Sequence, residues 1–409
     1  MSRIAACRSC GGGGLVPVLD LGETPLANAL LEQERPREPE PRFPLELVFC
    51  QSCTLLQITE TVPPEVLFGE YLYFSSFSDT MVAHAKALVG RLVAERGLGP
   101  GSLAVEAASN DGYLLRFYRE AGVPVLGIEP AANIAKVARE RGVETLCRFF
   151  GTEVARELAA AGTSADVIHA NNVLAHVADL NGFVEGFALL LKGDGRVVVE
   201  TPYAKDMLDG VEFDTIYHEH LCYYSLTALD ALFRRHRMTV CDVERLAIHG
   251  GSLRVFAARS GAAEPSPAVR ALLEEERRWG VADPAFYRGF GARVNALRES
   301  LRGLLGRLKA EGRRVAAYGA SAKGSTLLNT SGIGRETLDF VADRSTVKQG
   351  RFTPGTHLPV VAPERLAEAM PDYTLLLTWN FADEILAQQA EYRRRGGKFI
   401  VPIPEVKIV

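Results

Sequence analysis

The chain has 409 residues, of which 47% are hydrophobic and 23% are charged, with a formal net charge of −4 at pH 7. This is the composition of a globular protein with room for two or three hydrophobic cores. Near-balanced charge without a long Lys or Arg run argues against a nucleic-acid partner. No apolar run has the length of a signal peptide or membrane span, so we expect a cytoplasmic protein without membrane contact.

Two CxxC pairs lie in the first 60 residues, Cys7-Arg-Ser-Cys10 and Cys50-Gln-Ser-Cys53. Four thiolates match the tetrahedral preference of structural Zn²⁺, and paired cysteines in a reducing cytosol indicate metal rather than disulfides. Redox dithiols and unliganded buried cysteines are the alternatives. The proline-rich segment 34–44 is expected to be a loop between the pairs. We predict a closed zinc site held by Cys7, Cys10, Cys50 and Cys53.

From Ser102 onward, short apolar runs alternate with helical stretches. This alternation predicts a doubly wound parallel sheet, in which ligands bind at the carboxyl ends of the strands. The runs are LAVEAA, VPVLGIEP, ADVIHANNV and GRVVVETPY, at 103–108, 123–130, 165–173 and 195–203.

The turn after the first run, Glu106 to Gly112, partly matches the E-x-G-x-G-x-G loop of S-adenosylmethionine enzymes. Ala108 and Asn110 replace the first two glycines. Glu129 ends the second run, where an acid can bind ribose hydroxyls, although both acids could instead only cap their strands. Because no GxGxxG is present, S-adenosylmethionine is favoured over NAD. The predicted cofactor-binding residues are Glu106, Ser109, Asn110, Gly112, Glu129, Asn171 and Asn172.

Segment 213–224, FDTIYHEHLCYY, gathers two histidines, an acid and three tyrosines just past the last run. Histidine suits general-base catalysis because its pKa lies near working pH and a neighbouring acid can orient it. An H-x-H metal pair is the alternative, although no third ligand is suggested nearby. His176, Tyr71 and Tyr73 could also reach a substrate, or could serve as a structural histidine and as packing aromatics.

Residues 265–312 have helical periodicity and are expected to be a packing connector. A second alternation follows, RRVAAYGAS, LDFVADRS, YTLLLTWN and KFIVPIP, which predicts a second Rossmann-like sheet. Ser321 and Lys323 lie in a turn before a helix, and Lys348 and Arg351 follow the second run. Cations and backbone donors there could bind a pyrophosphate, or the cations could be solvated surface charges.

Four motifs together resemble the zinc-containing dTDP-sugar C-3′-methyltransferases that make branched deoxysugars of antibiotics, of the tetronitrose and kijanose type. The motifs are LDLGETPLANALL after the first CxxC, the ExxSNDGYLL loop, TIYHEHLCYYS and YGASAKGSTLLN. The resemblance covers essentially the whole chain.

In that family a 4-keto group acidifies the C-3 hydrogen, a base removes it, and the enolate takes the methyl group from S-adenosylmethionine. The resemblance implies that His220 is the base, supported by Tyr217 and Glu219, with His176 and Tyr71 beside the sugar. It also implies a dTDP-linked keto-sugar partner bound by Tyr71, Tyr217, Ser321, Lys323, Lys348 and Arg351.

We therefore expect an α/β protein with a zinc-binding module at 1–75, a Rossmann-like S-adenosylmethionine methyltransferase domain at 76–260, and a helical connector with a second Rossmann-like, nucleotide-sugar-binding domain at 261–409. Similarity favours dTDP-3-amino-2,3,6-trideoxy-4-keto-D-glucose as substrate, with a 3-hydroxy sugar left open. Alternatives are an O- or N-methyltransferase acting on a related nucleotide sugar, a zinc-headed RNA-modifying protein and a catalytically silent nucleotide-sugar-binding protein. Stereochemistry and oligomeric state stay open.

Overall fold

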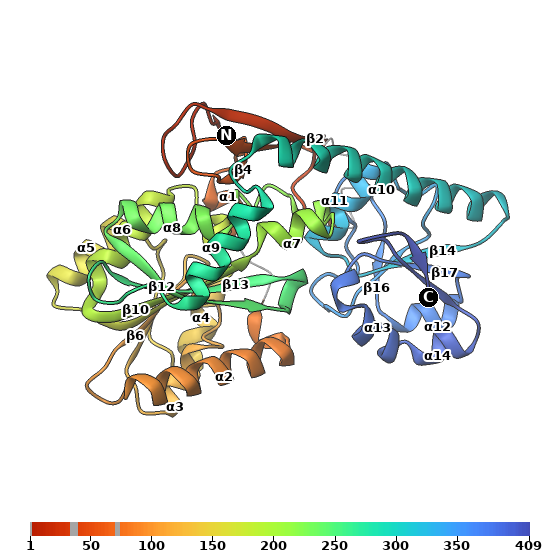
Figure 1. Ribbon diagram of the computed structural model, residues 1–409. Coiled ribbons are helices and arrows are strands. Elements are labelled where there is room, and N and C mark those ends of the chain that lie inside the picture. Colours follow the sequence, from red (N-terminus) through yellow and green to blue (C-terminus); the bar gives the residue numbers. More distant parts are fainter. Residues whose placement is uncertain (1, 33–39, 70–73) are drawn as a thin grey trace.

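A computed structural model describes residues 2–32, 40–69 and 74–409. In Figure 1 the N-terminal head lies over helices that cover one face of a large central sheet, and a long helix runs from the head towards a second α/β domain that contains the C-terminus.

The head is an antiparallel sheet that is completed by a strand from far along the chain. Its strands have the order β11-β4-β3-β2. The strand β11 pairs Cys222 with Gln57 and Tyr223 with Leu56. Because β11 directly follows the histidine-rich segment, this pairing attaches that segment to the head. The bounds are β2 Leu15–Thr24, β3 Phe43–Cys50, β4 Leu56–Ile58 and β11 Cys222–Tyr223, with the two-stranded sheet β1 Ser2–Arg3 and β5 Glu60–Thr61 and the short helix α1 Pro64–Phe68 beside them.

The central sheet has seven strands in the order β12-β13-β10-β9-β6-β7-β8. The strands from β8 to β10 are parallel, and β13 is antiparallel to both of its neighbours. Within this sheet the chain forms β6 first and then β7 and β8 on one side of it. It returns to form β9 on the other side of β6, so the switch point lies between β6 and β9. The bounds are β6 Ala104–Ala107, β7 Val125–Ile128, β8 Thr145–Leu146, β9 Ala165–Asn171, β10 Leu191–Pro202, β12 Met238–Leu246 and β13 Ser252–Arg259.

Helices cover both faces of this sheet, as the continuous apolar strands require. On one face α2 and α3 pack through Ala85, Val89 and Leu115, and on the other α5, α6 and α8 pack through Ala155, Phe187 and other buried side chains. The bounds are α2 Asp79–Arg96, α3 Leu115–Glu120, α4 Ala132–Glu140, α5 Thr152–Ala160, α6 Leu180–Leu190, α7 Ala204–Asp209, α8 Leu226–Arg235 and α9 Pro267–Trp279.

The connector is the 27-residue helix α10, Pro284–Ala310. Asp283 caps its first turn by accepting a hydrogen bond from the Ala285 N–H, and Pro284 occupies the first turn, where its missing donor costs nothing. Tyr287 stacks on Phe49 of the head with ring centroids 4.3 Å apart. The helix therefore joins the head to the C-terminal domain.

The C-terminal domain contains a six-stranded sheet in the order β16-β15-β14-β17-β18-β19, parallel except for β19. Its switch point lies at β14, between β15 and β17. The bounds are β14 Val315–Tyr318, β15 Val341–Ala342, β16 Val360–Val361, β17 Tyr373–Leu376, β18 Lys398–Val401 and β19 Lys407–Ile408, with α11 Ala322–Ser331, α12 Glu364–Ala369, α13 Ala382–Gln388 and α14 Ala390–Arg394.

The predicted fold class, a cysteine-bearing head followed by two Rossmann-like domains, is confirmed. Among the described residues, no helix is long and apolar enough to span a membrane.

Candidate active site

The four predicted zinc ligands converge in the head. Their sulfur atoms lie within 4.8 Å of one another, with Cys7 Sγ 3.6 Å from Cys53 Sγ and Cys10 Sγ 3.5 Å from Cys50 Sγ. Tetrahedral bonds of about 2.3 Å would place the sulfurs about 3.8 Å apart, close to these distances. Gln57 Nε2 donates to Cys7 Sγ at 3.1 Å, a contact that stabilises a thiolate. The cluster fits a closed structural Zn²⁺ site.

The cofactor loop keeps a glycine-type backbone although two of its glycines are replaced. Ala108, Asn110 and Gly112 have φ angles of 54°, 49° and 76°, at the three glycine positions of E-x-G-x-G-x-G. Asn tolerates the left-handed region, whereas a Cβ on Gly112 would lie 2.7 Å from Val143 Cγ2. The loop therefore has the backbone conformation of the glycine-rich version. At Gly112 a side chain is also excluded for lack of space.

Glu129 braces this loop from the end of β7. One carboxylate oxygen accepts from the Asn110 N–H and the other from the Ala131 N–H, both at 2.9 Å. Each oxygen keeps a second lone pair, so the same carboxylate can still accept from a ligand hydroxyl. Asn172 follows β9 with a φ of 57° and donates its N–H to the Glu200 carbonyl at 2.7 Å.

Unsatisfied buried polar atoms gather at the carboxyl ends of β6 and β9. Within the described part of the chain, Glu106 Oε2, Ser109 Oγ and Asn171 Oδ1 have no hydrogen-bond partner. Burial, and then the nearby Glu129 carboxylate, raises the pKa of Glu106 well above its ordinary value. Orphaned polar atoms at a switch point fit a polar ligand, which agrees with S-adenosylmethionine at this place.

The His220 imidazole is oriented by a main-chain carbonyl. Its Nδ1 lies 2.9 Å from the Thr215 carbonyl oxygen, and because a carbonyl only accepts, Nδ1 must carry a proton. The lone pair of the neutral ring is therefore on Nε2, which accepts from the Tyr217 hydroxyl at 2.9 Å. The predicted base thus has a defined basic atom.

His176 lies beside this pair, in the 3₁₀ turn Leu174–His176. Its ring centroid is 4.8 Å from that of His220, and its Nδ1 donates to the Glu219 carbonyl at 2.7 Å. Burial lowers the pKa of His176 to about 4, so the ring is neutral at pH 7.

The carboxyl group of Glu219 is held by a residue of the head. Asn28 Nδ2 donates to Glu219 Oε1 at 2.7 Å. Burial raises the pKa of Glu219 to about 7, while the Asn28 hydrogen bond and the Lys348 charge oppose that rise. We did not predict Asn28 as a site residue. Its place in the LDLGETPLANALL motif was the available signal.

The C-terminal domain contributes Ser321 and Lys348 to the same region. Lys348 Nζ donates to the Ala320 carbonyl at 2.8 Å, and Ser321 Oγ caps α11 by accepting from the Gly324 N–H at 3.1 Å. Arg351 is half-buried three residues after Lys348, and no described contact ties its side chain to this group.

Lys323 faces the methyltransferase domain. Its Nζ is buried without a hydrogen-bond partner among the described residues, 4.9 Å from the Trp379 ring centroid. Burial raises the pKa of Glu212 to about 8 and the pKa of Asp214 above its ordinary value, and the Lys323 charge opposes both rises. Trp379 Nε1 donates to Asp214 Oδ2 at 2.7 Å. These contacts join the two domains, and sequence reasoning missed the two acids and the tryptophan.

The alternative H-x-H metal pair does not form. His218 Nε2 lies 3.1 Å from the Pro44 carbonyl, whereas His220 turns to Thr215. The group of potential metal ligands found in the described residues is the four cysteines. Predicted Tyr71, with Tyr73, lies outside the described residues.

Three family models match the chain in succession. They are described as "Putative zinc binding domain" at residues 7–68, "Methyltransferase domain" at 81–240 and "C-methyltransferase C-terminal domain" at 247–404. C-methyltransferase NovU of Streptomyces niveus is 41% identical over 407 residues, which is 99% of this chain and 97% of NovU.

Two solved methyltransferases resemble 44% of the chain. The magnesium protoporphyrin IX methyltransferase ChlM from Synechocystis PCC 6803, with bound SAM, is 17% identical over 44% of this chain and 82% of its own, with a TM-score of 0.34. The 1,6-didemethyltoxoflavin-N1-methyltransferase of Burkholderia thailandensis is 17% identical over 44% of this chain and 78% of its own, with a TM-score of 0.32.

The match to NovU over nearly the whole of both chains supports a carbon acceptor over the O- and N-methyltransferase alternatives. The head adds a cysteine site for zinc, and the central domain matches a methyltransferase model. The chain belongs to the zinc-binding, S-adenosylmethionine-dependent C-methyltransferases.

Proposed function

We propose that the enzyme methylates C-3′ of a dTDP-linked 4-keto-deoxysugar, in the synthesis of a branched antibiotic sugar. The preferred substrate in this proposal is dTDP-3-amino-2,3,6-trideoxy-4-keto-D-glucose. The observation that carries the proposal is the His220 imidazole, with its basic Nε2 defined by Thr215 and Tyr217 and with Lys348 and Ser321 close to the same segment.

The carboxyl ends of β6, β7 and β9 hold the cofactor in this proposal. Glu106, Ser109 and Asn171 offer buried polar atoms that lack protein partners, and Glu129 fixes the loop. Bound S-adenosylmethionine supplies a methyl group that is activated by its sulfonium. The enzyme must then generate a carbon nucleophile on the substrate, next to that methyl group.

A sugar carbon becomes a nucleophile only after it loses a proton, and the adjacent 4-keto group makes the C-3 hydrogen acidic. When the Tyr217 hydroxyl releases the lone pair of His220 Nε2 to the substrate, Nε2 takes that proton, while the Thr215 carbonyl keeps the ring in place. Glu219 has a pKa of about 7 and can donate a hydrogen bond to the developing enolate oxygen when it is protonated. The neutral His176 ring lines the same space without adding charge.

The diphosphate is assigned to the turn before α11 and to the loop after β15. Ser321 caps this helix N-terminus, where backbone N–H groups attract anions, and Lys348 reaches the same turn. Lys323 and Arg351 remain predicted ligands of the diphosphate. The position of Lys323 near Asp214 also lets it stabilise the contact between the two domains.

Product analysis tests this proposal. The enzyme is incubated with S-adenosylmethionine and a panel of dTDP-4-keto-6-deoxysugars with an amine or a hydroxyl at C-3, and the products are identified by mass spectrometry and NMR. We expect one new methyl group, bonded to C-3. A methyl group on oxygen or nitrogen, or turnover with none of the panel, would contradict the proposal.

A further inference from the structure

The short 3₁₀ turn before the histidine-rich segment is held by the C-terminal domain. This turn, η3, comprises Phe213–Thr215, and α11 packs against it. Asp214, in the middle of the turn, is completely buried, and its Oδ2 accepts from Trp379 Nε1 at 2.7 Å. Its Oδ1 has no hydrogen-bond partner among the described residues. A buried carboxyl group of the methyltransferase domain therefore takes a hydrogen bond from another domain.

The indole ring that donates this hydrogen bond has a fixed place in the C-terminal domain. It belongs to the first residue of the 3₁₀ turn η5, Trp379–Phe381, which comes after β17. The first turn of α11 lies directly against the preceding chain, because a Cβ on Gly324 would come within 2.7 Å of Leu377 Cβ. This close approach brings Lys323 Nζ to 4.9 Å from the ring centroid, where a cation attracts the face of the ring. The donor is thus positioned by packing within its own domain.

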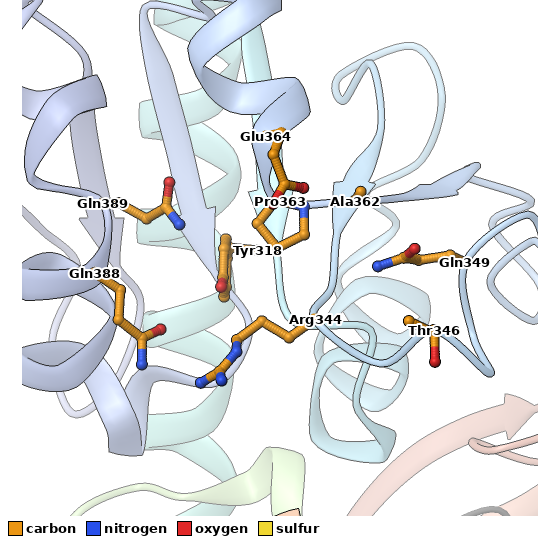
Figure 2. A pocket seen from close by; sticks show the side chains of 9 residues that line it. All are labelled: Tyr318, Arg344, Thr346, Gln349, Ala362, Pro363, Glu364, Gln388 and Gln389. Atoms are coloured by element: carbon orange, nitrogen blue, oxygen red, sulfur yellow. The ribbon is translucent and has the colours of Figure 1, made fainter.

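The contact is separate from the cavity of about 540 Å³ in the same domain. Figure 2 shows the side chains that line that cavity, among them Tyr318 and Arg344. Lys323, Trp379 and Asp214 are not part of this lining. A substitution of Trp379 or Asp214 therefore leaves the lining residues of the cavity unchanged.

Asp214 is bonded directly to the residue that orients the His220 imidazole. The Thr215 carbonyl accepts from His220 Nδ1 at 2.9 Å, and the Tyr223 hydroxyl donates to the same oxygen at 3.4 Å. Peptide units are rigid, and hydrogen bonds weaken steeply when their angles change. A displacement of Asp214 would therefore turn the neighbouring carbonyl away from His220 and release the imidazole ring.

We infer that Trp379 and Asp214 are positioning residues for the base, and that the C-terminal domain aligns His220 through the indole N–H, the Asp214 carboxyl group and the Thr215 carbonyl. The inference rests on the proposed function, because it takes His220 as the base. It makes the alignment of the base depend on the contact between the two domains. Since neither positioning residue is assigned to the substrate, their loss should lower kcat and leave substrate affinity unchanged.

Steady-state kinetics of the zinc-loaded, full-length enzyme test the inference. Trp379→Phe keeps a ring but removes the donor, and should lower kcat by about tenfold while KM for the nucleotide-linked sugar stays within about twofold. Asp214→Ala should have the same effect. Asp214→Asn keeps an oxygen acceptor for the indole N–H, and its kcat should stay within about threefold of the wild type. Trp279→Phe is the matched control, because Trp279 is the other of two tryptophans and ends α9.

A spectroscopic measurement distinguishes positioning from a loss of stability. ¹⁵N NMR of the histidine rings, at a pH where they are neutral, reports which ring nitrogen carries the proton, and His220→Asn identifies the His220 signals. We expect the proton on Nδ1 of His220 in the wild type, Asp214→Asn and Trp279→Phe. We expect a mixture of both tautomers in Trp379→Phe and Asp214→Ala. His176 is an internal reference, since its Nδ1 donates to the Glu219 carbonyl instead.

Unchanged kcat and an unchanged His220 tautomer in Trp379→Phe and Asp214→Ala would overturn the inference and leave the proposed function untouched. A lower kcat with the wild-type tautomer would also overturn it, because the contact would then only stabilise the fold. If Trp379→Phe does not fold, the comparison of Asp214→Ala with Asp214→Asn decides. If the wild type methylates C-3 of no sugar, the proposed function fails, whereas the tautomer measurement needs no substrate and still tests the alignment of His220.

Discussion

Two main-chain carbonyls decide which ring nitrogen carries the proton in the two histidines of the candidate site. The Thr215 carbonyl accepts from His220 Nδ1, and the Glu219 carbonyl accepts from His176 Nδ1, so each ring carries its proton on Nδ1. The residue types were predictable, because TIYHEHLCYY concentrates them in one short segment. The basic atom was not predictable, because it depends on a turn that brings a carbonyl to each ring.

Replacing His220 with Asn removes the proposed base. We expect kcat to fall by at least about 100-fold, because general-base catalysis contributes factors of this size. The Kd values for dTDP and S-adenosylhomocysteine should stay as in the wild type, as measured by calorimetry. Near-normal turnover in this variant would remove His220 from its assigned role.

Replacing Asn28 with Ala removes the hydrogen bond from the head to Glu219. That bond favours the charged carboxylate, so its loss raises the pKa of Glu219 further above about 7. We expect the Glu219 limb in the pH profile of kcat/KM to move to higher pH, and we expect no such limb in Glu219→Gln.

Asn295→Ala is the control for this substitution, because Asn295 is exposed on α10. A profile that is identical in wild type and Asn28→Ala would show that Asn28 does not act through Glu219.

At the scale of elements, the loop after β6 shows how backbone conformation can persist when its residues change. The left-handed conformation at Ala108 and Asn110 matches the glycine pattern of the wider class. The strand alternation and the two Rossmann-like sheets were predictable from apolar periodicity. The strand β11 was not, because two residues carry no periodicity and their partner β4 lies far away in sequence.

Gly112→Ala tests whether this loop needs glycine for space as well as conformation. Gly122 is a matched control, since it has the same φ of 76° but nothing within 4 Å of an added Cβ. Gly122→Ala should cost about 1–2 kcal/mol of unfolding free energy from backbone strain alone. Gly112→Ala should cost more and should weaken S-adenosylhomocysteine binding. Equal stability and affinity in both variants would contradict the predicted clash with Val143.

At the scale of the whole molecule, the candidate site is assembled from all three parts of the chain. Asn28 comes from the head, His220 from the central domain and Lys348 from the C-terminal domain. The zinc ligands were predictable because each pair has the short CxxC spacing. The Asn28 and Lys323 contacts were not, because they join segments more than 100 residues apart. The domain boundaries at residues 75 and 260 and the role of Tyr71 stay predictions.

Zinc removal should therefore affect catalysis although no zinc ligand contacts the substrate. We expect Cys50→Ser to lose zinc, to lower Tm and to reduce kcat, because the head supplies Asn28 and shares a sheet with β11. Metal analysis, thermal melting and a turnover assay measure these effects. Cys147→Ser is the control, since Cys147 lies outside the cluster. Unchanged Tm after complete loss of zinc would refute a structural role.

The fate of the C-3 hydrogen tests the central claim most directly. A dTDP-4-keto-sugar deuterated at C-3 is converted by the enzyme, and deuterium is measured in the solvent and in the methylated product. Carbon methylation through an enolate predicts that one deuterium is released for each methyl group transferred, and that none is released by His220→Asn. A methylated product that retains its C-3 deuterium would contradict this account.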